Sequence, residues 1–354
     1  MNFLIFDFKV NVQKNNWLSV WESWGNKEIH AHPDFIKLSA CSEDEILAFY
    51  TETLDGGILF PIIKRTISSE SWYDGEDFYF DVITPYGYGG AFCWGTGEYY
   101  RDFFWEQYNI WCKKNNVVST LIRQSLFKNQ VLTPIGEVSS PYKNIVRRLN
   151  VKEEDLLNDY KHSIRKNLKR AISSGLKIEV DLCGRNLNDF LTIYHSTMDR
   201  VDAKGQYYFS EEYFKEFIDK LSGHFGFFHV RYKEKIIATE LVLMSSKNIY
   251  SFLGGTISEY NSMRPNNFLK HEIIKWGTKN GKINFVLGGG YKKDDGIFKY
   301  KKAMAPDGEY DFYLAKVIHD ADAFQALVFK NSNWKKINAK DSNIENDFFP
   351  SYRA

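Results

Sequence analysis

The sequence predicts an α/β protein with two similar tandem domains, each built from a mixed sheet with flanking helices. Three observations support this prediction. Of the 354 residues, 44% are hydrophobic and 26% are charged, which is typical of a globular chain long enough for two domains. Strand-like and helix-like segments alternate along the chain. The same series of elements also occurs twice, in the same order.

The repeat begins at two glycine pairs, residues 89–90 and 254–255, each of which follows a strand-like segment. A helix follows each pair, and its closing tryptophan, Trp111 or Trp276, lies 21 residues after the second glycine. A strand and a short helix complete each copy. The second copy has about seven extra residues, within the glycine-rich segment 288–296. We therefore expect the second copy to be the specialised one.

Local patterns justify the remaining elements in chain order. Residues 1–9 are apolar but interrupted by two charged residues, which predicts a first strand and not a signal peptide. Turn residues at 55–57 and at 233–234 each separate two strand-like segments and predict two hairpins. Apolar residues at intervals of three and four predict one helix from about residue 154 to 174, which Gly175 ends.

These elements place a first domain at residues 1–150 and a second at residues 151–317, which carries the expected active site. The C-terminal residues 318–354 are expected to form a tail that packs back on the first domain.

Charge and cysteine content exclude several classes of protein. The 46 Lys and Arg residues nearly balance 45 Asp and Glu residues, so we do not expect a dedicated DNA-binding protein. The four cysteines form no C-x-x-C pair, so we expect no bound metal. No segment approaches the ~18 apolar residues of a membrane helix. We expect a cytoplasmic protein without a transmembrane segment.

A predicted basic helix carries Lys161, Arg165 and Lys169 at intervals of four residues. Binding of a diphosphate requires several converging cations, which makes Arg165 and Lys169 candidate substrate-binding residues. A solvated charged helix face explains the same pattern.

The glycines of the second copy allow backbone N–H groups to approach a ligand oxygen or an oxyanion. Glu240 lies in an apolar strand, where loss of hydration could raise a carboxyl pKa toward neutrality, so it is a candidate base. An outward-facing glutamate is the alternative. Arg200 and the aromatic residues that follow it could line a substrate pocket, although helix capping also explains Arg200. Motifs of dinucleotide-binding and Walker-type phosphate sites are absent.

Several segments resemble the FemABX family and its GNAT acetyltransferase-like relatives. They are residues 163–171, 197–200, 253–255 and 296–301, with residues 84–90 as the matching strand of the first domain. The resemblance implies two tandem GNAT-like domains and N-acyl transfer, in which a substrate amine attacks a thioester or an aminoacyl ester. In this family an aromatic-lysine pair in the last short helix matches Tyr300-Lys301, and the lysine is thought to stabilise charge during acyl transfer.

The resemblance implies transfer of an acyl group from acyl-CoA to an amino group, and an acetyl group is the first expectation. The expected acceptor is a nucleotide-linked or lipid-linked amino-sugar precursor of a cell-envelope polysaccharide. One alternative is aminoacyl-tRNA-dependent transfer to a peptidoglycan precursor, and another is a non-catalytic protein that binds a glycan or a partner. The chain has residues 264–269 where CoA-binding relatives carry a glycine-rich loop, and it lacks the coiled-coil arm of some tRNA-using members.

These arguments define the expected site. The expected catalytic residues are Lys301 and Glu240. The expected substrate-binding residues are Arg165, Lys169, Arg200, Tyr207, Tyr250, Gly254, Gly255, Gly289, Tyr291 and Tyr300.

Overall fold

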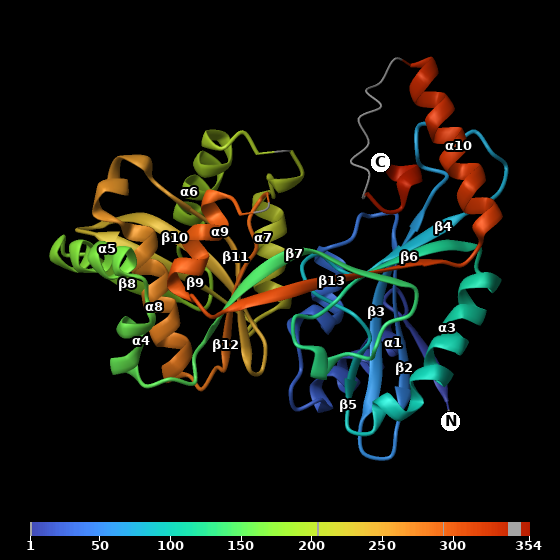
Figure 1. Ribbon diagram of the computed structural model, residues 1–354, viewed down its shortest axis with the longest axis horizontal. Coiled ribbons are helices and arrows are strands. Elements are labelled where there is room, and N and C mark those ends of the chain that lie inside the picture. The colour runs from blue at the N-terminus through green and yellow to red at the C-terminus, as the bar shows by residue number, and fades with distance from the viewer. Residues whose placement is uncertain (1, 204, 293, 339–347) are drawn as a thin grey trace. The chain divides into compact units, whose positions relative to one another are not determined.

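The computed structural model describes residues 2–203, 205–292, 294–338 and 348–354, and the chain forms two compact units (Figure 1). Unit 1 comprises Met1–Trp24, His30–Pro141 and Phe312–Ala354, and unit 2 comprises Gly25–Ile29 and Tyr142–Asp311. The chain passes between the units after Trp24 and after Ile29, and again within the strands β7 (Glu137–Arg148) and β13 (Glu309–Ile318). The domain limits expected from the sequence stay predictions, and residues 339–347 of the expected tail lie outside the described residues.

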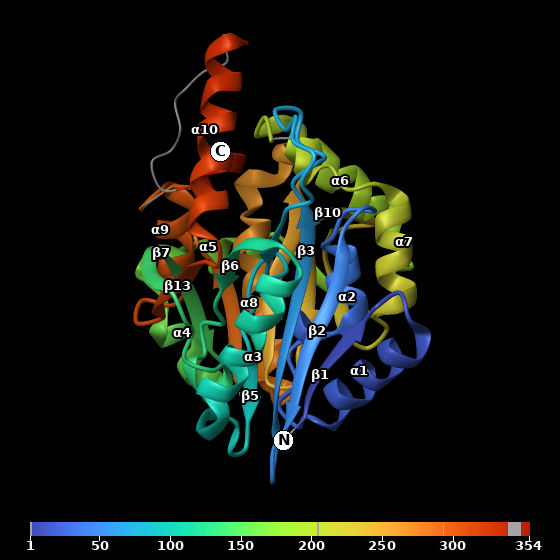
Figure 2. The ribbon, with the colours of Figure 1, turned by 90° about the vertical axis from the view of Figure 1, so that its right-hand side faces the viewer.

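Unit 1 is built on a mixed sheet with the strand order β1-β2-β3-β4-β6-β13, and β5 pairs with β3. The strands are β1 Phe3–Asp7, β2 Glu45–Glu52, β3 Gly57–Thr66, β4 Phe80–Ile83, β5 Phe92–Trp94, β6 Val117–Arg123 and β13 Glu309–Ile318. The predicted hairpin around residues 55–57 is β2 and β3, which lie side by side in Figure 2. Only β4 and β6 run parallel among these pairs.

Helices cover this sheet because their apolar residues pack into it. They are α1 Asn11–Ser23, α2 Pro33–Leu38, α3 Arg101–Lys114 and α10 Ala321–Ile337, with short 3-10 turns η1 Ile29–Ala31, η2 Gly97–Tyr100, η3 Lys128–Gln130 and η6 Ser351–Arg353. Helix α3 buries Phe104, Trp105 and Tyr108 against Phe49 and Phe60 of the sheet. The core of unit 1 is therefore largely aromatic.

Unit 2 has the strand order β7-β12-β11-β10-β9-β8. The strands are β7 Glu137–Arg148, β8 Lys177–Asp181, β9 Phe225–Tyr232, β10 Lys235–Met244, β11 Asn248–Thr256 and β12 Asn284–Gly288. The predicted hairpin at residues 233–234 is β9 and β10, and β11 and β12 are the parallel pair.

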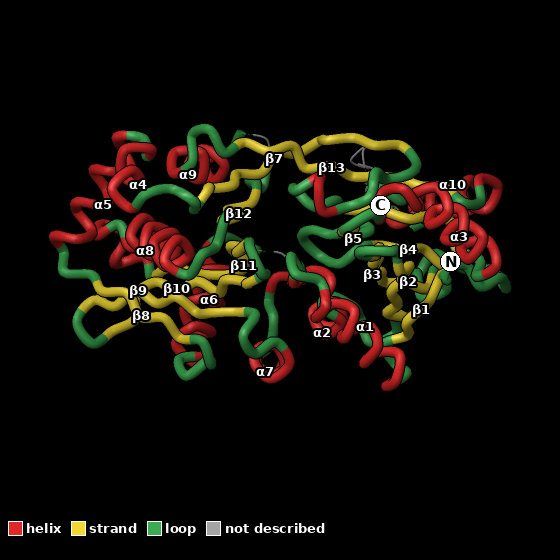
Figure 3. The backbone as a smooth tube through the Cα atoms, turned by 90° about the horizontal axis from the view of Figure 1, so that it is seen from below, coloured by secondary structure: helices red, strands yellow, loops and turns green. Residues whose placement is uncertain are grey.

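Helices lie on both faces of the unit 2 sheet (Figure 3). They are α4 Glu153–Asp159, α5 His162–Ser173, α6 Leu187–Arg200, α7 Glu211–Lys220, α8 Pro265–Lys279 and α9 Gly296–Met304, with 3-10 turns η4 Gly205–Tyr207 and η5 Ser258–Met263. Helices α5 and α8 share a core with Phe228 of β9, whereas α6 and α7 pack on the other face, where Phe190 contacts Phe227. The prediction of a mixed α/β fold is confirmed.

The prediction of one continuous helix over residues 154–174 is wrong. The backbone is extended at Tyr160 and Lys161, between α4 and α5. At this point the Lys161 amide donates to the carbonyl of Ala303, 3.0 Å away, and the buried Tyr160 hydroxyl bonds to His271 at 3.1 Å. These tertiary bonds replace the helical ones, so the helix ends and starts again.

Unit 2 includes a short segment from near the N-terminus, Gly25–Ile29. Its Glu28 carboxylate accepts from the Asn248 side chain at 2.5 Å and from the Tyr250 hydroxyl at 2.7 Å. All three residues are buried, so the carboxylate belongs to the core hydrogen bonding of unit 2.

Candidate active site

The parallel strands β11 and β12 of unit 2 pair over a short stretch and then separate. Asn248, Ile249 and Tyr250 face residues 284–286 of β12. Beyond Tyr250, β11 continues to Thr256 beside β10, while β12 continues to Gly288 beside β7, its partner on the other edge. Within the described chain, residues 251–256 thus have no strand partner on the β12 side. An open strand edge presents backbone N–H and C=O groups that can bind a ligand.

A β-bulge lies in this open part of β11. Leu253 faces Leu241 and Ser251 faces Val242, so Phe252 is the extra residue. Bulges redirect side chains and backbone groups, and they are common beside active sites.

The two glycines after the bulge allow close packing onto β11. A Cβ at Gly254 would lie 2.5 Å from the Thr239 carbonyl oxygen, and one at Gly255 would lie 2.4 Å from the Thr197 hydroxyl on α6. The structure therefore requires both glycines for packing. Their expected role in ligand binding stays a prediction.

A buried ion pair lies where β11 and β12 separate. The Lys270 ammonium on α8 donates to the Glu240 carboxylate at 2.5 Å and to the Ser251 hydroxyl at 2.7 Å. Lys270 is 9% exposed and Glu240 is 4% exposed. The ammonium also lies 5.4 Å from the ring centre of Phe285 on β12. One cation thus connects α8 with all three strands at the opening.

Lys301 enters the same site from α9. Asp295 starts this helix by accepting from the Phe298 amide at 2.7 Å. The Lys301 ammonium donates to the carbonyl of Gly289, 2.6 Å away. Burial, together with the nearby charge of Lys270, lowers its pKa to about 8, although Glu240 and Asp295 act in the opposite direction. Lys301 can therefore gain and lose a proton near neutral pH.

Tyr300 connects α9 to the end of the open strand. Its hydroxyl donates to the carbonyl of Asn266 at 3.1 Å, and the Asn266 side chain accepts from the Thr256 hydroxyl at 2.5 Å. Burial raises the pKa of Tyr300, so its phenol stays protonated. Arg200 reaches the same strand end and donates to the Thr256 carbonyl at 2.9 Å. The structure thus brings Tyr300 and Arg200 to one end of β11.

The other expected site residues lie in different settings. Tyr250 is buried with its hydroxyl on Glu28, and Tyr207 accepts a hydrogen bond from Tyr194 through its carbonyl. Tyr291 is 71% exposed in the loop before α9, where its amide donates to Asp295 at 2.6 Å.

The basic residues of α5 lie on its surface. Arg165 and Lys169 are both exposed, and Arg165 donates to the carbonyl of Tyr160 at 2.6 Å. The buried face of this helix is formed by Ile164 and Leu168. A solvated position of this kind agrees with either explanation of the charge pattern.

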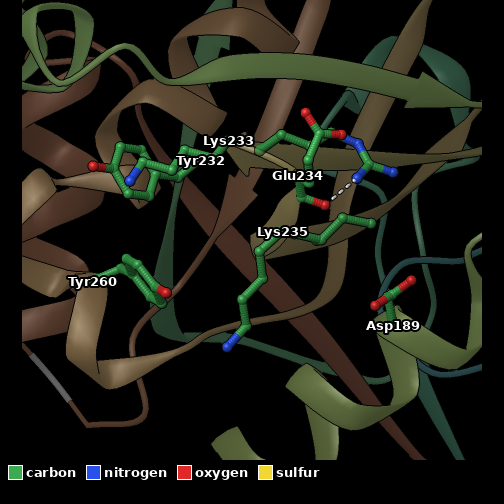
Figure 4. A pocket seen from close by; sticks show the side chains of 8 residues that line it. Asp189, Tyr232, Lys233, Glu234, Lys235 and Tyr260 are labelled. Carbon is green, nitrogen blue, oxygen red and sulfur yellow. Dashed lines mark hydrogen bonds between the residues drawn. The ribbon is translucent and has the colours of Figure 1, made fainter.

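Two hollows in unit 2 lie outside the expected site. A pocket of about 460 Å³ surrounds the β9–β10 turn. In Figure 4 the Lys235 side chain lies between Tyr260 and Asp189. Another, of about 490 Å³, lies beside α8 and is lined in part by Trp276 and Leu156. None of the site residues expected from the sequence lines either pocket.

Lys270 is the site residue that the sequence analysis missed. Its neighbours Leu269, Ile273 and Ile274 form the buried face of α8, and Lys270 is buried with them. A lysine on the apolar stripe of a predicted helix was the available signal, because a buried ammonium requires a partner.

Across the described ranges, no group of three or more His, Cys, Asp or Glu side chains is arranged to hold a metal ion. None of the helices in the same ranges combines the length and apolar character needed to cross a membrane.

A comparison with known protein families shows to which class of enzyme this chain belongs. Residues 158–302 match the family described as "Acetyltransferase (GNAT) domain". Residues 158–302 form a GNAT acyltransferase domain. This GNAT domain contains the open strand, the ion pair and Lys301. The protein is thus an acyltransferase, as the sequence predicted.

Solved structures share the fold of nearly the whole chain. A crystal structure of FemX has a TM-score of 0.69 at 11% identity, covering 92% of this chain and 99% of that one. The C-terminal domain of a putative lysylphosphatidylglycerol synthetase from Agrobacterium fabrum has a TM-score of 0.54 at 12% identity, covering 92% and 98%. L-PGS from Bacillus licheniformis has a TM-score of 0.52 at 12% identity, covering 85% and 90%.

These similarities concern the fold, and together with the GNAT domain they confirm the predicted FemABX-like architecture. A comparison with curated protein sequences gave no match.

Proposed function

We propose that the protein transfers an acyl group from acyl-CoA to an amino group of an amino-sugar or nucleotide-sugar precursor of the cell envelope. The observation that carries the proposal is the unpaired edge of β11 in the GNAT domain, with Lys301 and Lys270 beside it. An extended donor can bind along such an edge through backbone hydrogen bonds, which leaves its carbonyl near the two cations.

The proposed reaction replaces the C–S bond at the acyl carbon with a C–N bond. The neutral amine of the acceptor attacks the thioester carbonyl, a C–N bond forms, and the C–S bond breaks. The Lys301 ammonium stabilises the negative charge on the oxygen and donates a proton to the leaving thiolate. It regains a proton from the nitrogen of the new amide. A pKa of about 8 suits this exchange, because an acid–base group works best near the ambient pH.

We assign the proton transfer to Lys301 because Glu240 already has a fixed partner. The Glu240 carboxylate is buried and accepts from the Lys270 ammonium at 2.5 Å. Glu240 as general base is the competing assignment.

A second donor, an aminoacyl-tRNA acting on a peptidoglycan precursor, is favoured by the start of α8. Helix N-termini bind phosphate through free amide groups. Here Pro265 has no N–H, and the amides of Asn267 and Phe268 donate to the Arg264 carbonyl. The first turn of α8 therefore offers few amides to a diphosphate. The FemX-like fold over 92% of the chain also supports this candidate.

A donor assay separates the two. Purified protein is incubated with radiolabelled acetyl-CoA and UDP-linked amino sugars, or with charged tRNA and a peptidoglycan precursor, and the acceptor is separated and counted. The leading proposal requires label on the amino sugar, lost in Lys301→Met and kept in Lys302→Met. Label from tRNA alone would establish the second candidate. Thermal stabilisation by a glycan without transfer from either donor would contradict both and support a binding protein.

A further inference from the structure

We infer that Lys270 is a positioning residue that holds the β-bulge of β11 in register at the open strand edge. Its consequence for catalysis rests on the proposed function, in which the donor binds along this edge. The buried ammonium performs this task through Ser251 and does not touch the substrate.

The bulge determines which backbone groups the open edge presents. In an antiparallel pair, successive residues direct their N–H and C=O groups alternately toward the partner strand and away from it. The extra residue Phe252 reverses this alternation for the residues that follow it. A donor that forms hydrogen bonds with residues 253–256 therefore depends on where the bulge lies.

Packing fixes the strand on the C-terminal side of the bulge. Gly254 faces Glu240, and a Cβ at Gly254 would lie 2.5 Å from the Thr239 carbonyl oxygen. Without the bulge, Leu253 would face Glu240 at this crowded position. The register beyond the bulge thus admits a glycine and excludes a leucine.

Lys270 fixes the strand on the N-terminal side of the bulge. Its ammonium donates to the Ser251 hydroxyl at 2.7 Å, and Ser251 directly precedes Phe252. The same ammonium donates at 2.5 Å to Glu240, the β10 residue that faces Gly254. One side chain of α8 therefore connects the residue before the bulge with the strand position opposite the residue two places after it.

An aromatic contact holds the bulge from the other face of the sheet. The Phe252 ring stacks on Phe217 of α7, with ring centres 6.2 Å apart. A contact between two rings tolerates a small displacement along the strand, whereas a charge-assisted hydrogen bond depends on the position of one oxygen atom. The bond from Lys270 to Ser251 is therefore the contact that is sensitive to register.

Ser251→Ala tests the inference directly, because it removes this bond and keeps the ion pair. Backbone amide exchange is followed residue by residue in the full chain by NMR. We expect the amides of residues 252–255 to exchange about tenfold faster, while the urea midpoint of unfolding falls only slightly. The dissociation constant of acetyl-CoA, measured by calorimetry, should rise about tenfold, and the KM of the acceptor should stay constant.

Ser246→Ala is the matched control. Ser246 lies in the turn before β11, and its hydroxyl donates to the Gly25 carbonyl at 2.9 Å. This variant also loses one serine hydrogen bond, but not one beside the bulge. Amide exchange at residues 252–255 and acetyl-CoA binding should therefore not change.

The double variant Lys270→Met/Glu240→Gln separates positioning from stability. It leaves no unpaired buried charge, so most of the unfolding midpoint that Lys270→Met loses should return. A methionine cannot donate to Ser251, so fast amide exchange and weak acetyl-CoA binding should persist. An ion pair with a purely structural role would recover all three properties together, and that result would overturn the inference.

The exchange measurement needs no donor, so it tests the inference even if the donor proves to be an aminoacyl-tRNA. Unchanged exchange at residues 252–255 in Ser251→Ala would overturn the role of Lys270. Faster exchange with unchanged acetyl-CoA affinity would support that role and contradict the proposed place of the donor on this edge.

Discussion

The two units differ most where their parallel strands meet. In unit 1, β4 pairs with β6 through Ile83, and Thr84 continues the contact because its amide donates to Leu121 and its hydroxyl accepts from Arg123. The chain then leaves the sheet in a glycine-rich loop. In unit 2, β11 stays in the sheet for six residues after its pairing with β12 ends. Similar strands thus produce a closed corner in one unit and an open edge in the other.

The helices beside these strand pairs, α3 in unit 1 and α8 in unit 2, also differ at one matching position. Trp105 of α3 and Lys270 of α8 each lie six residues before the closing tryptophan of the repeat. Trp105 packs on Phe60 with ring centres 5.3 Å apart, whereas Lys270 bonds to Glu240. An aromatic contact in unit 1 thus occupies the place of an ion pair in unit 2. At this position the helix of unit 1 is apolar and that of unit 2 is charged, which agrees with the active site that we propose in unit 2.

The largest expected effect comes from placing a charge at the apolar position of α3 and removing the charge from the matching position of α8. Trp105→Lys buries an unpaired charge beside Phe60, and Lys270→Met leaves the Glu240 carboxylate without its ammonium. Each should lower the free energy of unfolding by about 3–5 kcal/mol. Hydrogen exchange read by mass spectrometry assigns the loss to unit 1 or unit 2. Glu240→Gln added to Lys270→Met should recover most of the loss, and an unrecovered double variant would contradict the charge explanation.

Lys301 gives the next effect, on activity. Lys301→Met removes the charge that we propose stabilises the oxyanion, so kcat/KM should fall by about 10²–10³-fold, or about 3–4 kcal/mol. The neighbouring Lys302 bonds to Glu309 at 2.5 Å, and Lys302→Met should retain activity. When the two copies of the repeat are aligned by sequence, at an offset of 171 residues, Gln130 on the short turn η3 is the counterpart of Lys301. Gln130→Lys should not restore activity to Lys301→Met, and any rescue would show that unit 1 can supply the site.

Glycine substitutions should have a smaller effect on stability, and the effect should differ between the two units. Gly255→Ala places a methyl group 2.4 Å from the Thr197 hydroxyl and 2.6 Å from the Ile193 carbonyl, and should cost about 1–3 kcal/mol of stability. In unit 1, Gly89→Ala meets its nearest atom at 3.0 Å, so its cost should be smaller. Gly205→Ala has no atom within 4 Å and serves as control. Urea denaturation measures all three, and equal losses at Gly255 and Gly89 would remove this difference between the units.

The surface of α5 should show the smallest effect. Lys169 is exposed, so Lys169→Ala should raise the KM for an anionic substrate by no more than about fivefold, or ~1 kcal/mol, and salt should weaken the effect. Lys114→Ala, at an exposed position of α3 in unit 1, is the matched control. A KM that stays constant in Lys169→Ala at low salt would favour the solvated helix face over a binding role.

Much of the fold was predictable because periodicity and turn residues act locally. The hairpins at residues 55–57 and 233–234 and the helix that ends near Trp276 follow from such patterns. The break at Tyr160 did not, because it depends on a hydrogen bond to Ala303, more than a hundred residues away. An apolar stripe records which side of a helix is buried, but not where a distant carbonyl interrupts it.

The site was predictable in part for a related reason. The family resemblance pointed to Lys301, whose role stays a prediction, and the apolar strand around Glu240 predicted the burial of this carboxyl group. The partner of Glu240 was not evident, because Lys270 lies 30 residues away on another element. The separation of β11 from β12 was equally hidden, since a strand sequence does not show which of its edges stays paired.

The origin of Glu28 limits how far this enzyme can be divided into modules. A fragment that begins at Tyr142 would contain the GNAT fold but lose the carboxylate that Asn248 and Tyr250 bind. Glu28 and Asn248 are separated by 220 residues, so the ribosome releases the acceptor long before it makes the strand that needs it. Unit 2 can therefore complete this hydrogen bonding only after residue 250 has been made, with the segment around Glu28 kept available until then.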